Sequence, residues 1–148
     1  MDDQAFMKIA IDEGAMGLAE GGVPVGAALV ADSQVLGSGH NRRVQQGSVI
    51  RHGETDCLEN IGRLHASVYK RSTMYTTRSP CDMCTGAILL YGIPRVVIGE
   101  NQTFTGGEEY LRSRGVEVVN LDSPACKALM AEFIERYPDV WNEDIGEE

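Results

Sequence analysis

The sequence predicts a three-layer α/β/α fold built on a mixed five-stranded sheet. Residues 72–121 alternate strand, helix, strand, helix and strand, and two such crossover units place three strands in parallel. Residues 25–40 carry two short apolar segments around a polar turn, the pattern of an antiparallel hairpin. The 148 residues suffice for one domain with a substantial core and leave no room for a second. We therefore expect one α/β domain over residues 1–148.

The N-terminal elements are predicted from apolar spacing and from the helix breakers. Residues 3–20 have the spacing of an amphipathic helix, and the glycine- and proline-containing segment 21–24 ends it. Residues 25–30 and 35–40 form the two hairpin strands, with the turn at residues 32–33.

The central elements are a helix, a strand and a second helix. Residues 52–64 have apolar side chains at helical spacing, and residues 72–77 are rich in β-branched and aromatic residues, which favour a strand. The second helix extends to Tyr91, where Gly92 and Pro94 end it.

The C-terminal part completes the sheet and adds a tail. Further elements are predicted at residues 95–99 (strand), 108–114 (helix), 116–121 (strand) and 125–136 (amphipathic helix). The first of these is nearly all apolar, as expected for a strand buried on both faces. Residues 137–148 are acidic, but Trp141 and Ile145 favour a short helix that folds back as a lid.

The segment with Pro80, Cys81 and Cys84 is the strongest chemical signal in the chain. Pro80 suits the first position of a helix, so both cysteines are expected in the first turn. Side chains three residues apart share a helix face, and the helix N-terminus favours thiolates. Taken alone, the pair fits a redox dithiol and half of a structural zinc site equally well.

A second motif, His52-Gly53-Glu54, indicates a catalytic metal site. One histidine and two cysteines give zinc three protein ligands and leave a coordination position open for water or substrate. A glutamate two residues after the histidine completes the signature of zinc-dependent nucleobase deaminases. His52, Cys81 and Cys84 are therefore the predicted Zn²⁺ ligands, with Glu54 as the catalytic residue.

Composition limits the partners. The formal net charge of −9 disfavours a nucleic-acid substrate, which needs a basic protein face. The N-terminus shows no secretory signal and no apolar segment could span a membrane, so we expect a cytoplasmic protein. Cys57 and Cys126 should be reduced core residues, and His40 and His65 structural or surface groups.

The chain resembles the fungal-type cytosine deaminases of the cytidine deaminase-like superfamily. The resemblance covers nearly the whole length and rests on residues 20–24, 39–41, 52–54, 79–88, 91–95, 99–101 and 143–146. The zinc motif is common to the superfamily, whereas the stretch after Cys84 and the tail from Trp141 are more specific marks.

The resemblance implies hydrolytic deamination of a free pyrimidine base, cytosine to uracil and 5-fluorocytosine to 5-fluorouracil, by a homodimer with one Zn²⁺ per chain. Its implied substrate contacts are Asn41 and the backbone of Gly53 to the carbonyl, Asp144 to the ring N–H, and Phe104 and Trp141 over the ring. Ser79 and Arg78, beside the cysteines, are further candidate contacts. For Asn41, a role as a turn residue is the alternative interpretation.

Arg78 departs from the family pattern, which has an aliphatic residue before Ser-Pro-Cys. The simpler interpretation is a guanidinium that points outward and pairs with acidic groups. If Arg78 instead faces the pocket, its donors require an acceptor that cytosine does not offer on that edge. Isocytosine or another aminated heterocycle is then the alternative substrate.

Three other functions share parts of this pattern. A tRNA adenosine deaminase has the same zinc motif but needs a basic face. A cytidine deaminase needs room for ribose, which a folded-back Trp141 segment blocks. A non-catalytic zinc protein does not explain Glu54 beside an open coordination position.

Overall fold

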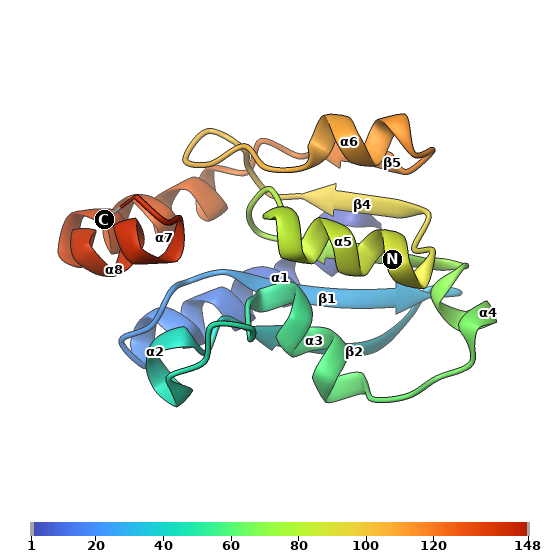
Figure 1. Ribbon diagram of the computed structural model, residues 1–148, viewed down its shortest axis with the longest axis horizontal. Coiled ribbons are helices and arrows are strands. Elements are labelled where there is room, and N and C mark those ends of the chain that lie inside the picture. The colour runs from blue at the N-terminus through green and yellow to red at the C-terminus, as the bar shows by residue number, and fades with distance from the viewer. Residues whose placement is uncertain (1, 148) are drawn as a thin grey trace.

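The computed structural model describes residues 2–147 and has the predicted three-layer α/β fold (Figure 1). The elements are, in chain order, α1 (Asp3–Ala19), β1 (Gly26–Ala31), β2 (Gln34–His40), α2 (Arg43–Gln46), α3 (Gly53–Ile61), α4 (Ala66–Tyr69), β3 (Ser72–Thr76), α5 (Asp82–Tyr91), β4 (Arg95–Ile98), α6 (Glu108–Ser113), β5 (Glu117–Asn120), α7 (Pro124–Arg136) and α8 (Pro138–Asp144). None of these helices is long and apolar enough to cross a lipid bilayer.

The strands form one mixed sheet in the order β2-β1-β3-β4-β5. β1 pairs antiparallel with both β2 and β3, whereas β3, β4 and β5 run parallel. The hairpin turn at Asp32 and Ser33 has φ angles of 53° and 60°, as a two-residue turn between twisted strands requires. The predicted hairpin and the three parallel strands are confirmed.

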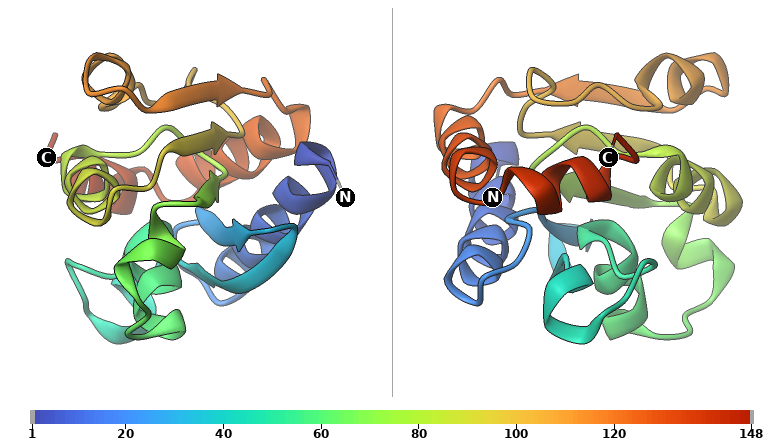
Figure 2. Two further views of the ribbon diagram at one scale, coloured as in Figure 1. Left: turned by 90° about the vertical axis from the view of Figure 1, so that its right-hand side faces the viewer. Right: turned by 60° about the vertical axis from the view of Figure 1, so that its left-hand side comes forward.

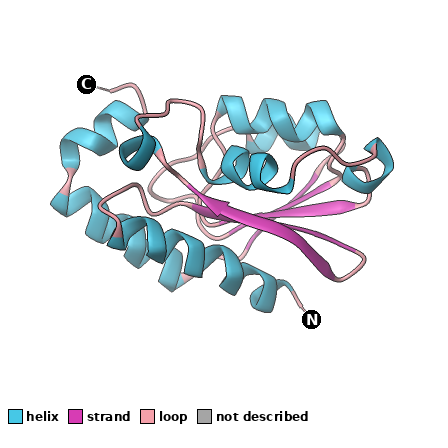
Figure 3. Cartoon of the chain, turned by 90° about the horizontal axis from the view of Figure 1, so that it is seen from below, coloured by secondary structure: helices cyan, strands magenta, loops and turns pink. Residues whose placement is uncertain are grey.

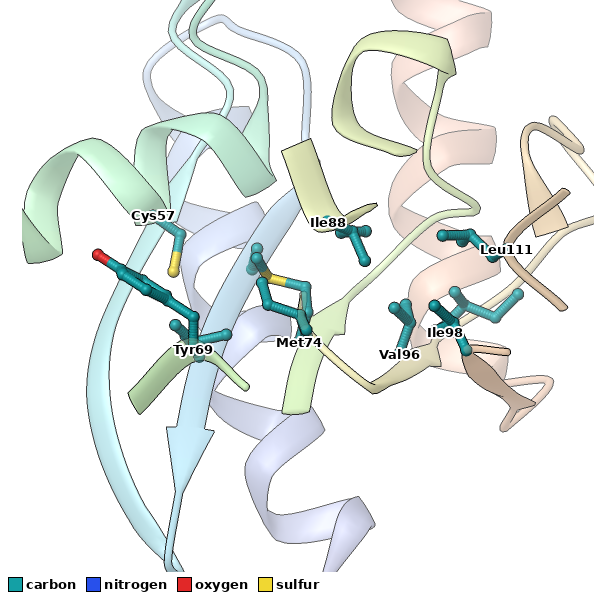
Figure 4. Packing of buried hydrophobic residues seen from close by; sticks show 11 residues of the cluster. Cys57, Tyr69, Met74, Ile88, Val96, Ile98 and Leu111 are labelled. Atoms are coloured by element: carbon teal, nitrogen blue, oxygen red, sulfur yellow. The ribbon is translucent and has the colours of Figure 1, made fainter. Parts of the chain in front are cut away.

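Two apolar clusters fix the three layers, because alternate residues of a strand face opposite sides of a sheet. Leu29 and Met74 belong to the cluster under α3, α5 and α6, which Figure 4 shows from close by. Val30 and Tyr75, their neighbours in sequence, belong to the cluster under α1 and α7. Figure 3 shows helices on both sides of the twisted sheet.

Some predicted boundaries were wrong. The helix predicted over residues 52–64 ends at Ile61, because Gly62 leaves helical geometry with a φ of 80°. The cysteine helix starts at Asp82, so Pro80 precedes the helix and Cys81 is its N-cap. The short helices α2 and α4 were not predicted, since four residues are too few to show a helical period.

The C-terminal tail folds back, as predicted. α8 follows α7 directly and turns toward the ends of the central strands (Figure 2). Trp141 is buried in a third cluster together with Val25 and Phe133. Arg43 pairs with Glu143 at 3.0 Å and Arg78 with Asp144 at 3.4 Å, so two ion pairs hold α8 against the body of the fold.

Candidate active site

Two helix N-termini supply the candidate metal ligands. His52 is the N-cap of α3 and Cys81 the N-cap of α5, both with extended backbone, and Cys84 follows in the first turn of α5. The free N–H groups at a helix start carry a partial positive charge, which stabilises thiolates. The local chain geometry therefore places three ligands near two positive helix ends.

The three ligands converge on one point. His52 Nδ1 lies 3.3 Å from Cys81 Sγ and 3.8 Å from Cys84 Sγ, and all three atoms lie within 4.8 Å of one another. Tetrahedral zinc with bonds of about 2.0–2.3 Å sets its ligand atoms about 3.5–4 Å apart. The donor set and the spacing thus fit one zinc ion, and the predicted ligands are brought together.

The two thiols have opposite pKa shifts. A hydrogen bond from Cys84, assisted by His52, lowers the pKa of Cys81 to about 3. The same shared proton, together with burial, raises the pKa of Cys84. Burial disfavours a charge on His52, but the Cys81 thiolate outweighs it and raises the His52 pKa. A divalent cation held by Cys81 and Cys84 would remove this competition, because both sulfurs could then be thiolates.

Glu54 lies beside the ligands on the first turn of α3 and is only 3 % exposed. Burial, and then the Cys81 thiolate, raise the pKa of its carboxyl group. A carboxyl group with a raised pKa in a buried site can both accept and return a proton near neutral pH. Its position fits the predicted catalytic role.

Arg78 faces the interior, so the outward interpretation was wrong. Its side chain is 5 % exposed, and its guanidinium carbon lies 4.9 Å from the Phe104 ring centre and 5.4 Å from that of Trp141. Both rings offer the negative face that attracts a guanidinium. The sequence could not show this, because both rings come from segments far along the chain.

Asp144 is the charged partner of Arg78 beside the candidate metal ligands. Its side chain is fully buried, with Oδ2 at 3.4 Å from Arg78 Nη1 and Oδ1 at 3.8 Å from His52 Nε2. Among the described residues, Asp144 Oδ1 and Arg78 Nε are buried without a hydrogen-bond partner. The ion pair therefore has one unpaired donor, on Arg78, and one unpaired acceptor, on Asp144, and the acceptor lies next to the metal ligand His52.

The loop after β4 carries Phe104 and is tied to the cysteine segment through Ser79. The Ser79 N–H donates to the Glu100 carbonyl at 3.0 Å, and its hydroxyl accepts from the Gly106 N–H at 2.9 Å. Ser79 thus fixes the loop that places Phe104, and direct contact of Ser79 with substrate stays a prediction.

Asn41 and Gly53 lie where the hairpin meets α3. Asn41 is buried and its Oδ1 accepts from the Arg43 N–H at 2.8 Å, which is the turn role, while Nδ2 remains available to donate. A Cβ on Gly53 would lie 2.9 Å from the Val25 carbonyl oxygen, so only glycine fits here. The Gly53 N–H lies in the first helical turn and has no acceptor within the helix.

Asp56 is a supporting residue that the sequence analysis missed. Its buried carboxylate accepts from Arg51 Nε at 2.7 Å, Arg42 Nε at 3.0 Å and the His40 N–H at 3.0 Å. It thereby ties the chain on both sides of the 41–51 loop to α3, just after His52. Two arginines shortly before an aspartate in the first helical turns were the available signal.

The remaining cysteines and histidines behave as predicted. Cys57 and Cys126 are reduced and buried in the two main clusters, outside the metal triad. His40 is buried between Glu13 and Glu20, and His65 is exposed.

Comparison with known proteins agrees with this geometry. Residues 1–100 match the cytidine and deoxycytidylate deaminase zinc-binding region. The chain is 54 % identical over 147 residues to a cytosine deaminase from Candida albicans, covering 99 % of this chain and 98 % of that protein. It is 31 % identical over 146 residues to a tRNA-specific adenosine deaminase from Haemophilus influenzae, covering 90 % and 84 %.

A solved structure supports the fold. A guanine deaminase from Nitrosomonas europaea superposes with a TM-score of 0.72 at 22 % identity, over 89 % of this chain and 84 % of that one. The chain therefore belongs to the cytidine and deoxycytidylate deaminase zinc-binding family, as the motifs predicted, and is a zinc-dependent enzyme that acts on C–N bonds.

Proposed function

We propose that the chain hydrolyses the free base cytosine to uracil and ammonia. The observation that carries the proposal is the convergence of one imidazole and two thiols within 4.8 Å, with the buried carboxyl group of Glu54 beside them. Three ligands leave zinc one open position, which a catalytic site needs and a structural site does not have. The identity to the Candida enzyme over nearly both whole chains supports cytosine as the substrate.

The chemistry follows from the residues present. Zinc in this site supplies a water molecule whose pKa is lowered toward neutrality. Glu54 takes a proton from that water and delivers it to the ring nitrogen next to the amine-bearing carbon. The oxygen adds to this carbon, Glu54 transfers the second proton to the amine, and the C–N bond breaks. Water and cytosine thereby give uracil and ammonia.

The substrate contacts are part of the proposal. Asn41 Nδ2 and the Gly53 N–H donate to the cytosine carbonyl, and Asp144 Oδ1 accepts from the ring N–H. Phe104 and Trp141, whose rings also contact the Arg78 guanidinium at 4.9 and 5.4 Å, line the base and replace water around it. 5-Fluorocytosine keeps all these groups, so we expect it to be a substrate as well. Residues 137–148 act as the lid of one catalytic domain over residues 1–148.

The proposal assigns the enzyme a small-molecule substrate, a cytoplasmic location and no nucleic-acid partner. The relative from Haemophilus influenzae is named a tRNA-specific adenosine deaminase. The net charge of −9 of the present chain disfavours binding to the phosphates of a nucleic acid. Trp141 is buried against Val25 and Phe133, and a nucleoside is proposed to be excluded because α8 would occupy the space that its ribose needs.

The assembly we propose is a homodimer through the face of α3, α4 and α5. A groove of about 870 Å³ lies there, lined by residues that include Leu58, Tyr69 and Ala87. Ile50 and Leu90 are 62 % and 74 % exposed, unusual values for large apolar side chains in one region. A second copy of this chain would cover them.

Light scattering on a sizing column tests the dimer. Ile50→Glu with Leu90→Glu should give monomers, whereas Val35→Glu, an exposed position on β2, should leave a dimer. A monomeric wild type would contradict the proposed assembly.

Absorbance assays of zinc-loaded protein test the function. Cytosine, 5-fluorocytosine, isocytosine, cytidine and guanine are compared side by side, with ammonia measured in parallel. We expect turnover of cytosine and 5-fluorocytosine and none of cytidine. Zinc-loaded protein that leaves every free base unchanged would overturn the proposal.

A further inference from the structure

We propose that Arg78 is a specificity-determining residue. Together with Asp144 it selects aminated six-membered rings that carry a hydrogen-bond acceptor next to the N–H held by Asp144. The inference rests on the proposed deamination and names the class of base that the same site prefers. Cytosine meets this requirement only in part.

Arg78 and Asp144 each have one buried polar atom without a hydrogen-bond partner among the described residues. Arg78 Nε has no acceptor and Asp144 Oδ1 has no donor, although both side chains are at most 5 % exposed. Asp144 Oδ1 is also the atom that approaches a metal ligand, at 3.8 Å from His52 Nε2. A buried polar atom without a partner costs free energy, which a ligand that supplies the partner recovers. A ligand that offers an acceptor to Arg78 Nε and a donor to Asp144 Oδ1 would satisfy both atoms.

The Arg78 guanidinium is held by one ion pair and two aromatic rings. Arg78 uses Nη1 for Asp144, and among the described residues its Nε has no partner. The rings of Phe104 and Trp141 hold the guanidinium plane in place at 4.9 and 5.4 Å. Arginine presents its N–H donors in a rigid planar fork that matches oxygen or nitrogen acceptors. A donor edge held beside the proposed base site would discriminate between an acceptor and a C–H group of the ligand.

The order of strands β2, β1 and β3 sets where Asn41 and Arg78 lie at the edge of the sheet. Asn41 directly follows β2, and Arg78 comes two residues after the end of β3, with β1 between these two strands. The backbone thus presents Asn41 and Arg78 on either side of β1, and Asp144 pairs with Arg78, on the β3 side. This donor, acceptor, donor pattern matches a ring edge with acceptor, N–H and acceptor in sequence.

Cytosine supplies two of these three groups. Its carbonyl and ring N–H suit Asn41 and Asp144, but the next ring position is a C–H that leaves Arg78 unpaired. 6-Azacytosine has a ring nitrogen at that position, and 6-amino-1,3,5-triazine-2,4-dione has a carbonyl. Both keep the amine-bearing amidine carbon on which the proposed chemistry depends.

The test compares kcat/KM for cytosine and 6-azacytosine in zinc-loaded wild type and Arg78→Leu. Leucine restores the aliphatic side chain of the related pattern and removes the donor. We expect the ratio of kcat/KM for 6-azacytosine to kcat/KM for cytosine to be about tenfold larger in wild type than in Arg78→Leu. One hydrogen bond from a charged group accounts for a factor of this size. The intrinsic reactivities of the two bases cancel in this ratio of ratios. Arg114→Leu, which removes an exposed arginine over Tyr110, should leave the ratio unchanged.

A binding measurement on wild type makes the test independent of any variant. Calorimetry in mildly acidic buffer should show 6-azauracil binding about tenfold more tightly than uracil. Zinc content and melting temperature show whether Arg78→Leu is folded, and Arg78→Met is the longer replacement if it is not.

The outcomes separate the two proposals. Equal ratios in wild type and Arg78→Leu, or equal affinities for uracil and 6-azauracil, would overturn the role of Arg78 while cytosine turnover upholds the deaminase. An Arg78→Leu variant whose kcat/KM rises equally for both bases would show that Arg78 only fills space, and this result would also overturn the role of Arg78. Absence of turnover with every base would instead reject the proposed function.

Discussion

The site has two halves that are built in different ways. The metal half consists of His52, Glu54, Cys81 and Cys84, and each residue lies at the start of a helix. The base half consists of Arg78, Phe104, Trp141 and Asp144, which come from a strand end, a loop and α8. Two short sequence motifs specify the metal half. The base half forms only when segments up to 66 residues apart come together.

The two halves also differ in how firmly the fold holds them. The metal half sits on two helices that pack on the sheet, so its geometry is fixed before any substrate binds. The base half depends on α8, which two ion pairs and the cluster around Trp141 hold in place. Changes in the metal half should therefore affect the chemical step, and changes in the base half should affect binding and closure.

The largest expected effect is on the metal half. Glu54→Gln removes the proton carrier but keeps a side chain of the same shape, so kcat should fall about 10³- to 10⁴-fold while zinc and fold remain. Steady-state kinetics and a zinc assay on the same sample measure this. Glu109→Gln, at an exposed first-turn glutamate of α6, is the matched control. An active Glu54→Gln enzyme would remove Glu54 from the mechanism.

Asp144→Asn breaks the charged contact of the base half. It leaves the Arg78 charge buried without its partner, which costs about 3 kcal/mol of folding stability. The change replaces one carboxylate oxygen by an NH2 group that can only donate and removes the negative charge, which should lower kcat/KM for cytosine about 10- to 100-fold. Denaturant unfolding and kinetics report the two effects. Asp139→Asn, an exposed change on the same helix, should do neither, and equal losses in both variants would argue against the assigned contact.

The aromatic lid should give a smaller effect with a direct optical signal. Trp141 is the only tryptophan in the chain, so intrinsic fluorescence reports on the base half alone. Binding of uracil to zinc-loaded protein should change this fluorescence, since the base would stack on the ring. Phe104→Leu should weaken uracil binding about 3- to 10-fold, as expected for loss of one aromatic contact. Trp141 fluorescence that does not change at saturating uracil would contradict the proposal that Trp141 covers the base.

The smallest effect should come from a contact outside both halves. Asp3 accepts from Arg95 at 2.7 and 2.9 Å and from the Tyr75 hydroxyl at 2.6 Å, and the Arg95 hydrogen bonds lower the Asp3 pKa to about 2. Because the folded pKa lies below the unfolded value, this stabilisation is complete above about pH 4 and disappears as the pH falls toward 2.

Asp3→Asn should therefore cost about 1 kcal/mol of unfolding free energy near neutral pH, after allowance for solvent screening at this partly exposed pair. The difference from wild type should shrink as the pH falls through this window, and kcat should not change. Denaturation curves at several pH values measure it. A difference that stays constant down to pH 2 would show that the charge of Asp3 is not its source.

The sequence predicted what is local or periodic. The order of strands and helices, the hairpin and the three metal ligands follow from apolar periods and short motifs. Helix ends were less accurate, because Gly62 and the extended backbone of Cys81 shift them by one to three residues. Periodicity does not record such single-residue backbone preferences.

The base half shows where sequence reasoning stops. Arg78 was expected outside because an arginine in an acidic chain has many possible partners. Its actual partners lie 26, 63 and 66 residues later, at Phe104, Trp141 and Asp144. Only the three-dimensional position of α8 makes the inward orientation favourable. The Asp56 network was missed although Arg51 and Arg42 lie only 5 and 14 residues before Asp56, because the sequence does not show which way an arginine side chain points.

The metal content of the purified protein tests the central claim most directly. One zinc per chain, bound through two sulfurs and one nitrogen in X-ray absorption spectra, is the predicted result, with zinc lost in Cys84→Ser and retained in Cys57→Ser. Protein that binds no zinc, or that keeps full zinc after Cys84→Ser, would contradict the account.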